Sequence, residues 1–126
     1  MAYVSRAPLN EQWHAGGFLV SQPRGNRHID RGLITGAVKV FPGTIMGQVT
    51  ATGSWVVCTA AAADGSQNAA GICFGLVDAT LNDQRGALVV RDCEVNTAEL
   101  VWDASMTPAL QTTALGLLQK QGIIAR

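Results

Sequence analysis

The sequence predicts one small α+β domain, mostly β, with many short strands, a single C-terminal helix and a flexible N-terminal arm. Three observations support this prediction. From residue 33 onward, short apolar runs alternate with turns that contain Gly, Pro, Asn and Asp. Helical periodicity occurs in one segment only, near the C-terminus, and the first 32 residues show almost no apolar periodicity. A chain of 126 residues also has the length of one domain that folds without disulfides or metals.

The N-terminal part differs in composition from the rest. Residues 1–32 carry four of the seven arginines, both histidines and two of the four prolines. We expect them to form a largely extended or disordered arm, followed by a single domain at 33–126. The arm has one apolar island in an otherwise polar segment, which is typical of chains that order on binding. We therefore expect it to contact a partner through Phe18, Leu19, Val20 and Ser21.

The strands of the domain follow from its turns. The run 33–40 predicts a strand that ends near Val40, and Pro42-Gly43 turns the chain into a strand at about 44–50. Gly47, inside that strand, indicates a β-bulge or the close approach of another backbone. We expect further strands at 55–58, 71–77 and 87–92, a polar connection at 78–86, two short strands that turn at Asn96-Thr97, and a last strand in the tail 123–126.

The stretch AAAADGSQNAAGIC, residues 60–73, combines helix-forming alanines with turn residues. Its alanine flanks are too short for stable helices, and it lies between two strand-like runs. We interpret it as a strand-to-strand loop whose small side chains allow close approach to another surface but supply little chemistry. Its exposed part is expected to comprise Asp64, Gly65, Ser66, Gln67 and Asn68.

One segment predicts a helix. Thr107 suits the N-cap and Pro108 the first helical position. Gly122 would follow the C-cap, which brings Ile123 against Leu118. The apolar face of this helix is expected to consist of Leu110, Ala114, Leu117 and Leu118.

The overall composition favours a partner protein over other ligands. Hydrophobic residues make up 48% and charged residues only 14%, so some apolar surface is expected to lie against another subunit or partner. The net charge is zero, which argues against direct nucleic-acid binding. No apolar run approaches the ~18 residues of a membrane helix, and the N-terminus has no signal pattern. We expect synthesis in the cytoplasm and no membrane association.

The cysteines and histidines predict neither a metal site nor a cofactor. Cys58 and Cys73 lie in apolar runs and are expected in the core, whereas Cys93 is expected to be more exposed. The three thiols have no paired spacing, and His14 and His28 match no ligand pattern. The sequence assigns the cysteines no role.

The search for catalytic groups favours a protein that is not an enzyme. Asp92 and Glu94 flank Cys93 and are interpreted as a solvated strand end rather than an acid–base pair. Nothing in the sequence brings Cys93 to His28, which we expect to be solvated. Neither glycine motif for phosphate binding occurs. Trp13, Trp55 and Trp102 are too dispersed for a stacking platform.

Two weaker similarities lack their essential residues. HIDRGLITG, residues 28–36, resembles the IDxxYxG motif of trimeric deoxyuridine triphosphatases, but it places Leu33 near the tyrosine position, and the sole tyrosine is Tyr3. Residues 39–53 resemble the turns of lipoyl and biotinyl carrier domains. Those domains display a lysine on an exposed hairpin, whereas Lys39 lies in a strand pattern and Lys120 on the helix end.

Several longer segments, in order along the chain, resemble one family. They are PGTIMGQVTATGSWV (42–56), AAADGSQNAAGI (61–72), VDAT (77–80), VVRDCEVNTAELVW (89–102) and LGLLQKQGIIAR (115–126). Together they resemble the head decoration proteins of tailed bacteriophages, of the lambda head protein D type. GGFLVSQPRGNRHIDRG (16–32) is similar to the N-terminal segment of that family, with Gly17 and Gln22 in place of acidic residues.

The resemblance, which covers about 16–126, implies a β-clip fold. It also implies a homotrimer that binds the major capsid protein at three-fold sites, on the outer surface of the expanded capsid. There it would act as a clamp against the pressure of the packaged DNA. Two alternatives stay open: a capsid-displayed module that binds a host surface, and a small trimeric nucleotide hydrolase of the same fold.

Overall fold

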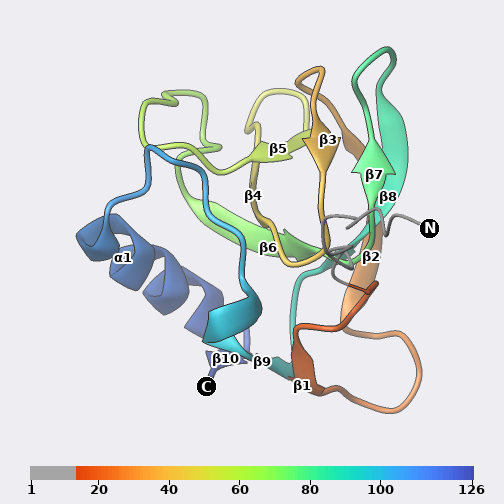
Figure 1. Cartoon of the computed structure of the whole chain (residues 1–126), viewed down its shortest axis with the longest axis vertical. Coiled ribbons are helices and arrows are strands. Elements are labelled where there is room, and N and C mark those ends of the chain that lie inside the picture. The colour runs from red at the N-terminus through yellow and green to blue at the C-terminus, as the bar shows by residue number, and fades with distance from the viewer. Residues whose placement is uncertain (1–13) are drawn as a thin grey trace, which may run out of the picture.

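Five of the strand-like runs close into a small barrel in the computed structural model, which describes residues 14–126 (Figure 1). The order around the barrel is β2-β5-β4-β6-β8. The mostly β fold with a small barrel and one C-terminal helix is thereby confirmed. The barrel strands are β2 (Ile29–Ile34), β4 (Ile45–Gln48), β5 (Trp55–Val57), β6 (Ala69–Cys73) and β8 (Gln84–Val89).

A smaller sheet and the helix lie on one side of the barrel. The sheet order is β1-β9-β10, so a strand from the start of the described chain pairs with a sheet formed by its last third. The helix α1 contacts β6 of the barrel and β10 of the small sheet. The elements outside the barrel are β1 (Leu19–Ser21), β3 (Lys39–Val40), β7 (Val77–Asp78), β9 (Cys93–Val95), the 3₁₀ helix η1 (Thr97–Glu99), α1 (Pro108–Gln119) and β10 (Ile123–Ala125).

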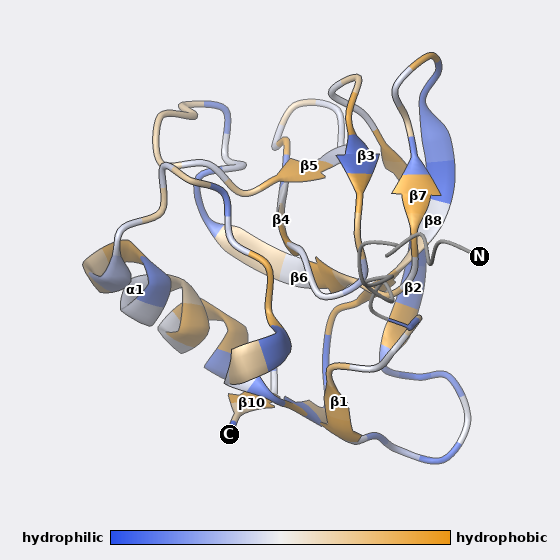
Figure 2. Ribbon diagram, in the orientation of Figure 1, coloured by the Kyte–Doolittle hydropathy of each residue, from blue (hydrophilic) through white to orange (hydrophobic). Residues whose placement is uncertain are grey.

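Consecutive apolar residues of the barrel strands enter two different cores. In β8, Leu88 packs with residues from all five barrel strands, whereas Val89 packs under the helix and the small sheet. In β4, Met46 belongs to the same core as Leu88, and Ile45 belongs to the same core as Val89. Neighbouring side chains of a strand point to opposite faces, and here a core covers each face. The barrel strands therefore have continuous apolar runs rather than polar–apolar alternation. Figure 2 shows the hydrophilic β1–β2 loop in blue, next to the hydrophobic strand β1 in orange.

The helix begins as the sequence predicts. The Thr107 hydroxyl accepts a hydrogen bond from the Leu110 N–H, and Pro108 occupies the first turn. The C-cap is Lys120, so Gly122 lies two residues beyond it rather than one; its φ of +89° is nevertheless left-handed. The buried face is Ala114 and Leu118, with Leu115 half-buried, whereas Leu110 is exposed.

Four strand predictions need correction. The expected strand at 71–77 is divided, because β6 ends at Cys73 and β7, which pairs with β3, begins at Val77. The expected strand at 33–40 is interrupted because Gly36 and Ala37 both adopt positive φ, so β2 and β3 are separate. The polar connection expected at 78–86 is shorter, since β8 begins at Gln84. The second strand after Asn96 is instead η1, because the Asn96 side chain accepts the Ala98 N–H and caps a helical turn. The short strand predicted in the C-terminal tail is confirmed as β10.

The N-terminal part that the structure describes is paired with the domain. β1 pairs with β9, and β2 pairs with β8 over its full length. β2 therefore crosses the boundary that we expected between residues 32 and 33. The first 13 residues of the expected arm, with Tyr3 and Trp13, lie outside the described residues. No helix among residues 14–126 is long and apolar enough to cross a membrane.

Candidate functional site

The four expected contact residues lie at the edge of the small sheet and differ in burial. Phe18 is 2% exposed and belongs to the core, whereas Val20 is 57% exposed. Leu19 is half-buried and Ser21 is exposed. Since β1 is an edge strand, Val20 and Ser21 are the two residues of this set that a partner can reach from outside.

Two backbone hydrogen bonds fix the segment that leads into β1. The Gly16 N–H donates to the Phe74 carbonyl at 2.9 Å, and the Asn96 N–H donates to the Phe18 carbonyl at 2.8 Å. A side chain at Gly16, whose φ is +70°, would collide with the Phe74 ring. Phe18 thus anchors the segment in the core, which the apolar pattern alone did not distinguish from a surface contact.

The outer end of β1 joins a small polar cluster. Glu94 accepts a hydrogen bond from the Ser21 hydroxyl at 2.9 Å and from Arg126 Nη2 at 2.7 Å. These bonds, that from Arg126 first, lower the pKa of Glu94. The cluster ties the edge strand to the C-terminal residue and leaves Glu94 unsuited to general acid chemistry.

The loop predicted between two strands is confirmed, since β5 precedes it and β6 follows it. Asp64 and Asn68 are exposed, Gly65 and Gln67 are half-buried, and Ser66 is 2% exposed. Ser66 is buried because its backbone lies against Gly47, where the pairing of β4 and β6 also has a register shift. The prediction for Gly47 is therefore confirmed: the strand has a bulge there, and another backbone approaches closely.

Three aspartates are held by the same local motif. Asp64 Oδ1 accepts hydrogen bonds from the Ser66 N–H and hydroxyl at 3.1 and 2.6 Å. Asp78 binds Thr80, and Asp103 binds Ser105, in the same way. The hydroxyl bonds are the main reason that the pKa of each carboxylate is lowered. The spacing Asp-x-Ser/Thr, which the sequence shows three times, was the signal that our sequence analysis missed.

The cysteines are all buried and free. Burial raises the pKa of the Cys73 thiol to about 11. Burial, and to a lesser extent Asp92, also raises the pKa of Cys93 to about 11. The expectation that Cys93 is more exposed is wrong, because its side chain enters the core under α1. Thiols with raised pKa values are poor nucleophiles at neutral pH.

The remaining candidates for chemistry are the carboxylates Asp92 and Glu94 and the imidazole of His28. Asp92 forms an ion pair with Arg27 at 3.7 Å, while Glu94 binds Arg126, so these carboxylates do not form an acid–base pair. His28, expected to be solvated, is 1% exposed, and neither ring nitrogen has a hydrogen-bond partner. Within residues 14–126, no group of three potential ligands could hold a metal ion.

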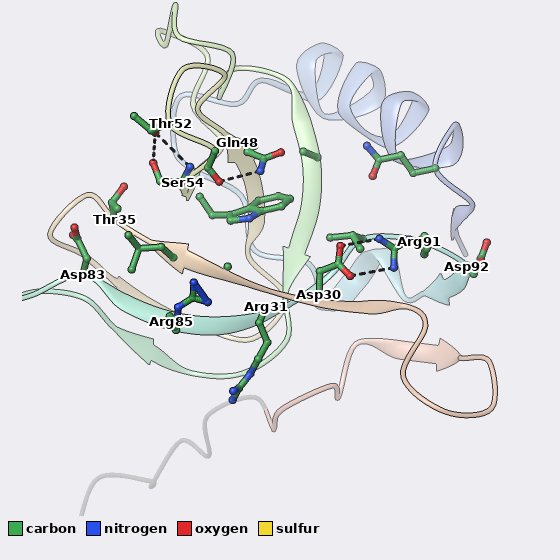
Figure 3. Close-up of a pocket in the computed structure, with 17 residues that line it drawn as sticks. Asp30, Arg31, Thr35, Gln48, Thr52, Ser54, Asp83, Arg85, Arg91 and Asp92 are labelled. Carbon is green, nitrogen blue, oxygen red and sulfur yellow. Dashed lines mark hydrogen bonds and ion pairs between the residues drawn. The ribbon is translucent and has the colours of Figure 1, made fainter.

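A cleft of about 1090 Å³ lies beside the barrel (Figure 3). It lies where β2 and β5 pair at a single position, Ile34 with Trp55. Asp30 and Arg91, on its wall, form a two-pronged ion pair with distances of 3.2 and 2.7 Å. Hydroxyl and amide groups also line it, together with apolar and further charged side chains: Thr35, Gln48, Thr52, Ser54 and Gln121, then Leu33, Trp55, Ala70 and Val90, then Arg31, Asp83, Arg85 and Asp92.

Most of the groups discussed above are engaged locally or buried. The described carboxylates that carry lowered pKa values are engaged in local motifs or ion pairs, and the thiols are buried. The accessible features are an edge strand, a braced loop and a cleft of mixed polarity.

Comparison with known proteins agrees with this picture. A family model described as bacteriophage lambda head decoration protein D matches residues 8–123. The match spans the barrel, the small sheet and the helix. A search of curated proteins finds no match.

Proposed function

Because the chain belongs to the bacteriophage lambda head decoration protein D family, we propose that it binds the outer surface of the expanded capsid as a homotrimer at three-fold sites. Its partner is the major capsid protein, and its role is to stabilise the shell against the pressure of the packaged DNA. Membership itself assigns the chain to the phage head as a structural protein. The observation that carries the proposal is the family match over residues 8–123.

The chemistry of the described surface supports a role without catalysis. The three aspartates of the Asp-x-Ser/Thr motif brace turns, and Glu94 braces the small sheet. A clamp needs such rigid local structure, because preorganised surfaces lose less entropy on binding. The equal numbers of acidic and basic residues also suit a protein partner rather than the packaged DNA.

The edge strand β1 is our candidate for the capsid contact. β1 pairs with β9 on one side only, and its register shifts between Leu19 and Ser21. The other edge is open to an added strand of the capsid protein, a common mode of peptide recognition. Val20 would face the partner, and Phe18 would anchor the strand from within the core.

The experiment is binding to expanded, undecorated shells of the same phage, with shell melting measured before and after. We expect saturable binding and a raised melting temperature of the shells. Val20→Asp should reduce binding, whereas Leu110→Asp on the exposed helix surface should not. Saturation without a gain in heat resistance would instead favour a host-binding module displayed on the capsid, and absence of binding would overturn the proposal.

A further inference from the structure

One edge of the barrel strand β2 is unpaired along most of its length. β2 pairs with β8 at every position from Ile29 to Ile34, but it pairs with β5 only where Ile34 lies beside Trp55. The described chain therefore places no neighbouring strand beside residues 29–33 on the side of β5. Residues 30–33 of this free edge form one wall of the cleft in Figure 3.

Hydrogen bonds at the two ends of β2 show which backbone groups lie on the free edge. The Val90 N–H donates to the His28 carbonyl, and the Thr35 N–H donates to the Trp55 carbonyl, both at 2.9 Å. Backbone groups of successive strand residues point to opposite sides, so even-numbered residues of β2 face β8 and odd-numbered residues face the cleft. The N–H and the carbonyl of Arg31 thus point toward the cleft, where the described chain has no strand to bind them.

The side chains at this edge differ between the two faces of the sheet. Arg31 and Leu33 lie on the outer face of the β2–β8 ladder, and Arg85, which pairs with Leu33, lies on the same face. Gly32 lies on the inner face, where a side chain would collide with the Trp55 indole. A strand added at the free edge would continue both faces. It therefore needs a charged side chain beside Arg31 and an apolar side chain beside Trp55.

The unpaired charges of the outer face indicate the sign of that charged side chain. Neither Arg31 nor Arg85 forms an ion pair or a side-chain hydrogen bond within residues 14–126. Of the carboxylates that line the cleft, Asp30 and Asp92 are already ion-paired, and Asp83 lies beyond the end of the β2–β8 ladder. A carboxylate on the added strand would therefore find an unpaired arginine at the free edge.

We propose that the cleft binds an extended segment of the major capsid protein as an added strand on the free edge of β2, with a carboxylate beside Arg31 and an apolar side chain against Trp55. This inference rests on the proposed function and adds a second contact to the one at β1, on a separate sheet. Strand addition satisfies the unpaired N–H and carbonyl groups of a sheet edge. A free anion would pair with Arg31 but would leave these backbone groups unpaired.

The first test compares two substitutions of Arg31 in the full chain, by titration of expanded, undecorated shells of the same phage. Arg31→Ala removes the guanidinium and should weaken binding about tenfold. Arg31→Pro also removes the N–H at the free edge but leaves the N–H groups that bind β8, and it should weaken binding about tenfold further. Lys39→Ala, on β3 away from the cleft, removes the same charge and should bind like the wild type. Circular dichroism and thermal melting establish that each variant is folded.

The second test measures backbone hydrogen exchange of β2 in the wild-type chain, residue by residue, before and after binding to the same shells. In the free chain, the amides of Asp30 and Gly32 bind β8 and should exchange slowly, whereas those of Arg31 and Leu33 should exchange fast. On the shells, exchange at Arg31 and Leu33 should slow by about tenfold or more. A contact through side chains alone would not slow these two amides.

The outcomes separate this inference from the proposed function. If the wild type binds shells, but the variants of Arg31 bind equally well or the amides of Arg31 and Leu33 still exchange fast, strand addition at β2 is wrong and the proposed function stands. If the two amides are already protected in the free chain, another part of the chain or a second copy covers the edge, which overturns the inference. A wild type that does not bind shells overturns both.

Discussion

Gly47 is the residue of β4 at which another segment comes closest. It is buried, and a side chain there would collide with the backbone of Ser66. Gly116, in the middle of α1, has no atom within 4 Å of the place where a side chain would begin, apart from its chain neighbours and the backbone of its own helix. Gly47 therefore permits close packing of the loop, whereas Gly116 only lowers the helix propensity of α1.

The same substitution at these two sites should have opposite effects. Gly47→Ala is expected to lower the free energy of unfolding by about 1–3 kcal/mol, because the loop has to move. Gly116→Ala is expected to raise it by about 1 kcal/mol. Urea unfolding of both variants measures the difference. If the Gly47→Ala variant were as stable as the wild type, the loop at Ser66 would be able to move without a loss of unfolding free energy.

The burial of His28 is expected to lower the free energy of unfolding, and a single substitution can test this. It is 1% exposed with neither ring nitrogen hydrogen-bonded, and a buried polar group in this state costs about 1–3 kcal/mol. His28→Leu keeps a similar volume and should raise the free energy of unfolding by about 1 kcal/mol, measured in urea. A clear loss of stability would show that the imidazole makes a contact worth more than its desolvation.

At the scale of elements, β1 is attached to the domain by one core side chain. Phe18→Ala should lower the free energy of unfolding by about 3–5 kcal/mol, because a large apolar group leaves a filled core. Val20→Ala, two residues away and 57% exposed, should change it by less than about 0.5 kcal/mol. Equal effects of the two substitutions would mean that β1 is detached in solution.

The small sheet should also respond to acid through Glu94. Arg126 and Ser21 lower the pKa of Glu94 in the folded protein. The stabilisation is thus present above the unfolded-state pKa of about 4.3 and is lost as the pH falls through the lower folded-state pKa. Thermal melting from pH 7 to pH 3 should show a smaller acid-dependent loss for Glu94→Gln than for the wild type. Parallel melting curves would contradict this role.

Elements with local signals could be predicted from the sequence, and those set by distant contacts could not. Thr107 and Pro108 mark the start of α1, and Gly47 marks the contact with Ser66, because caps and close approaches have residue-specific requirements. The burial of Phe18 and Cys93 depends on packing against segments far along the chain. The cleft likewise arises where β2 and β5 diverge, which no local pattern encodes.

At the scale of the whole molecule, the proposed capsid contact lies at the edge of β1, and each subunit carries one copy of it. In a trimer, three weak contacts act together, and linked contacts can exceed a single one by 10²–10⁴ in affinity. Damage to this contact should therefore lower the affinity of the trimer for the shell by much more than it lowers the affinity of one chain.

Two variants make this effect measurable. Val20→Asp should lose binding to shells, since the contact is damaged in every subunit. Leu110→Asp, on the exposed surface of α1, should bind like the wild type. Titration of undecorated shells with each purified variant measures both affinities, and circular dichroism establishes that both variants are folded. If Val20→Asp bound as tightly as the wild type, the edge of β1 would not be the capsid contact, and another surface of the domain would hold the shell.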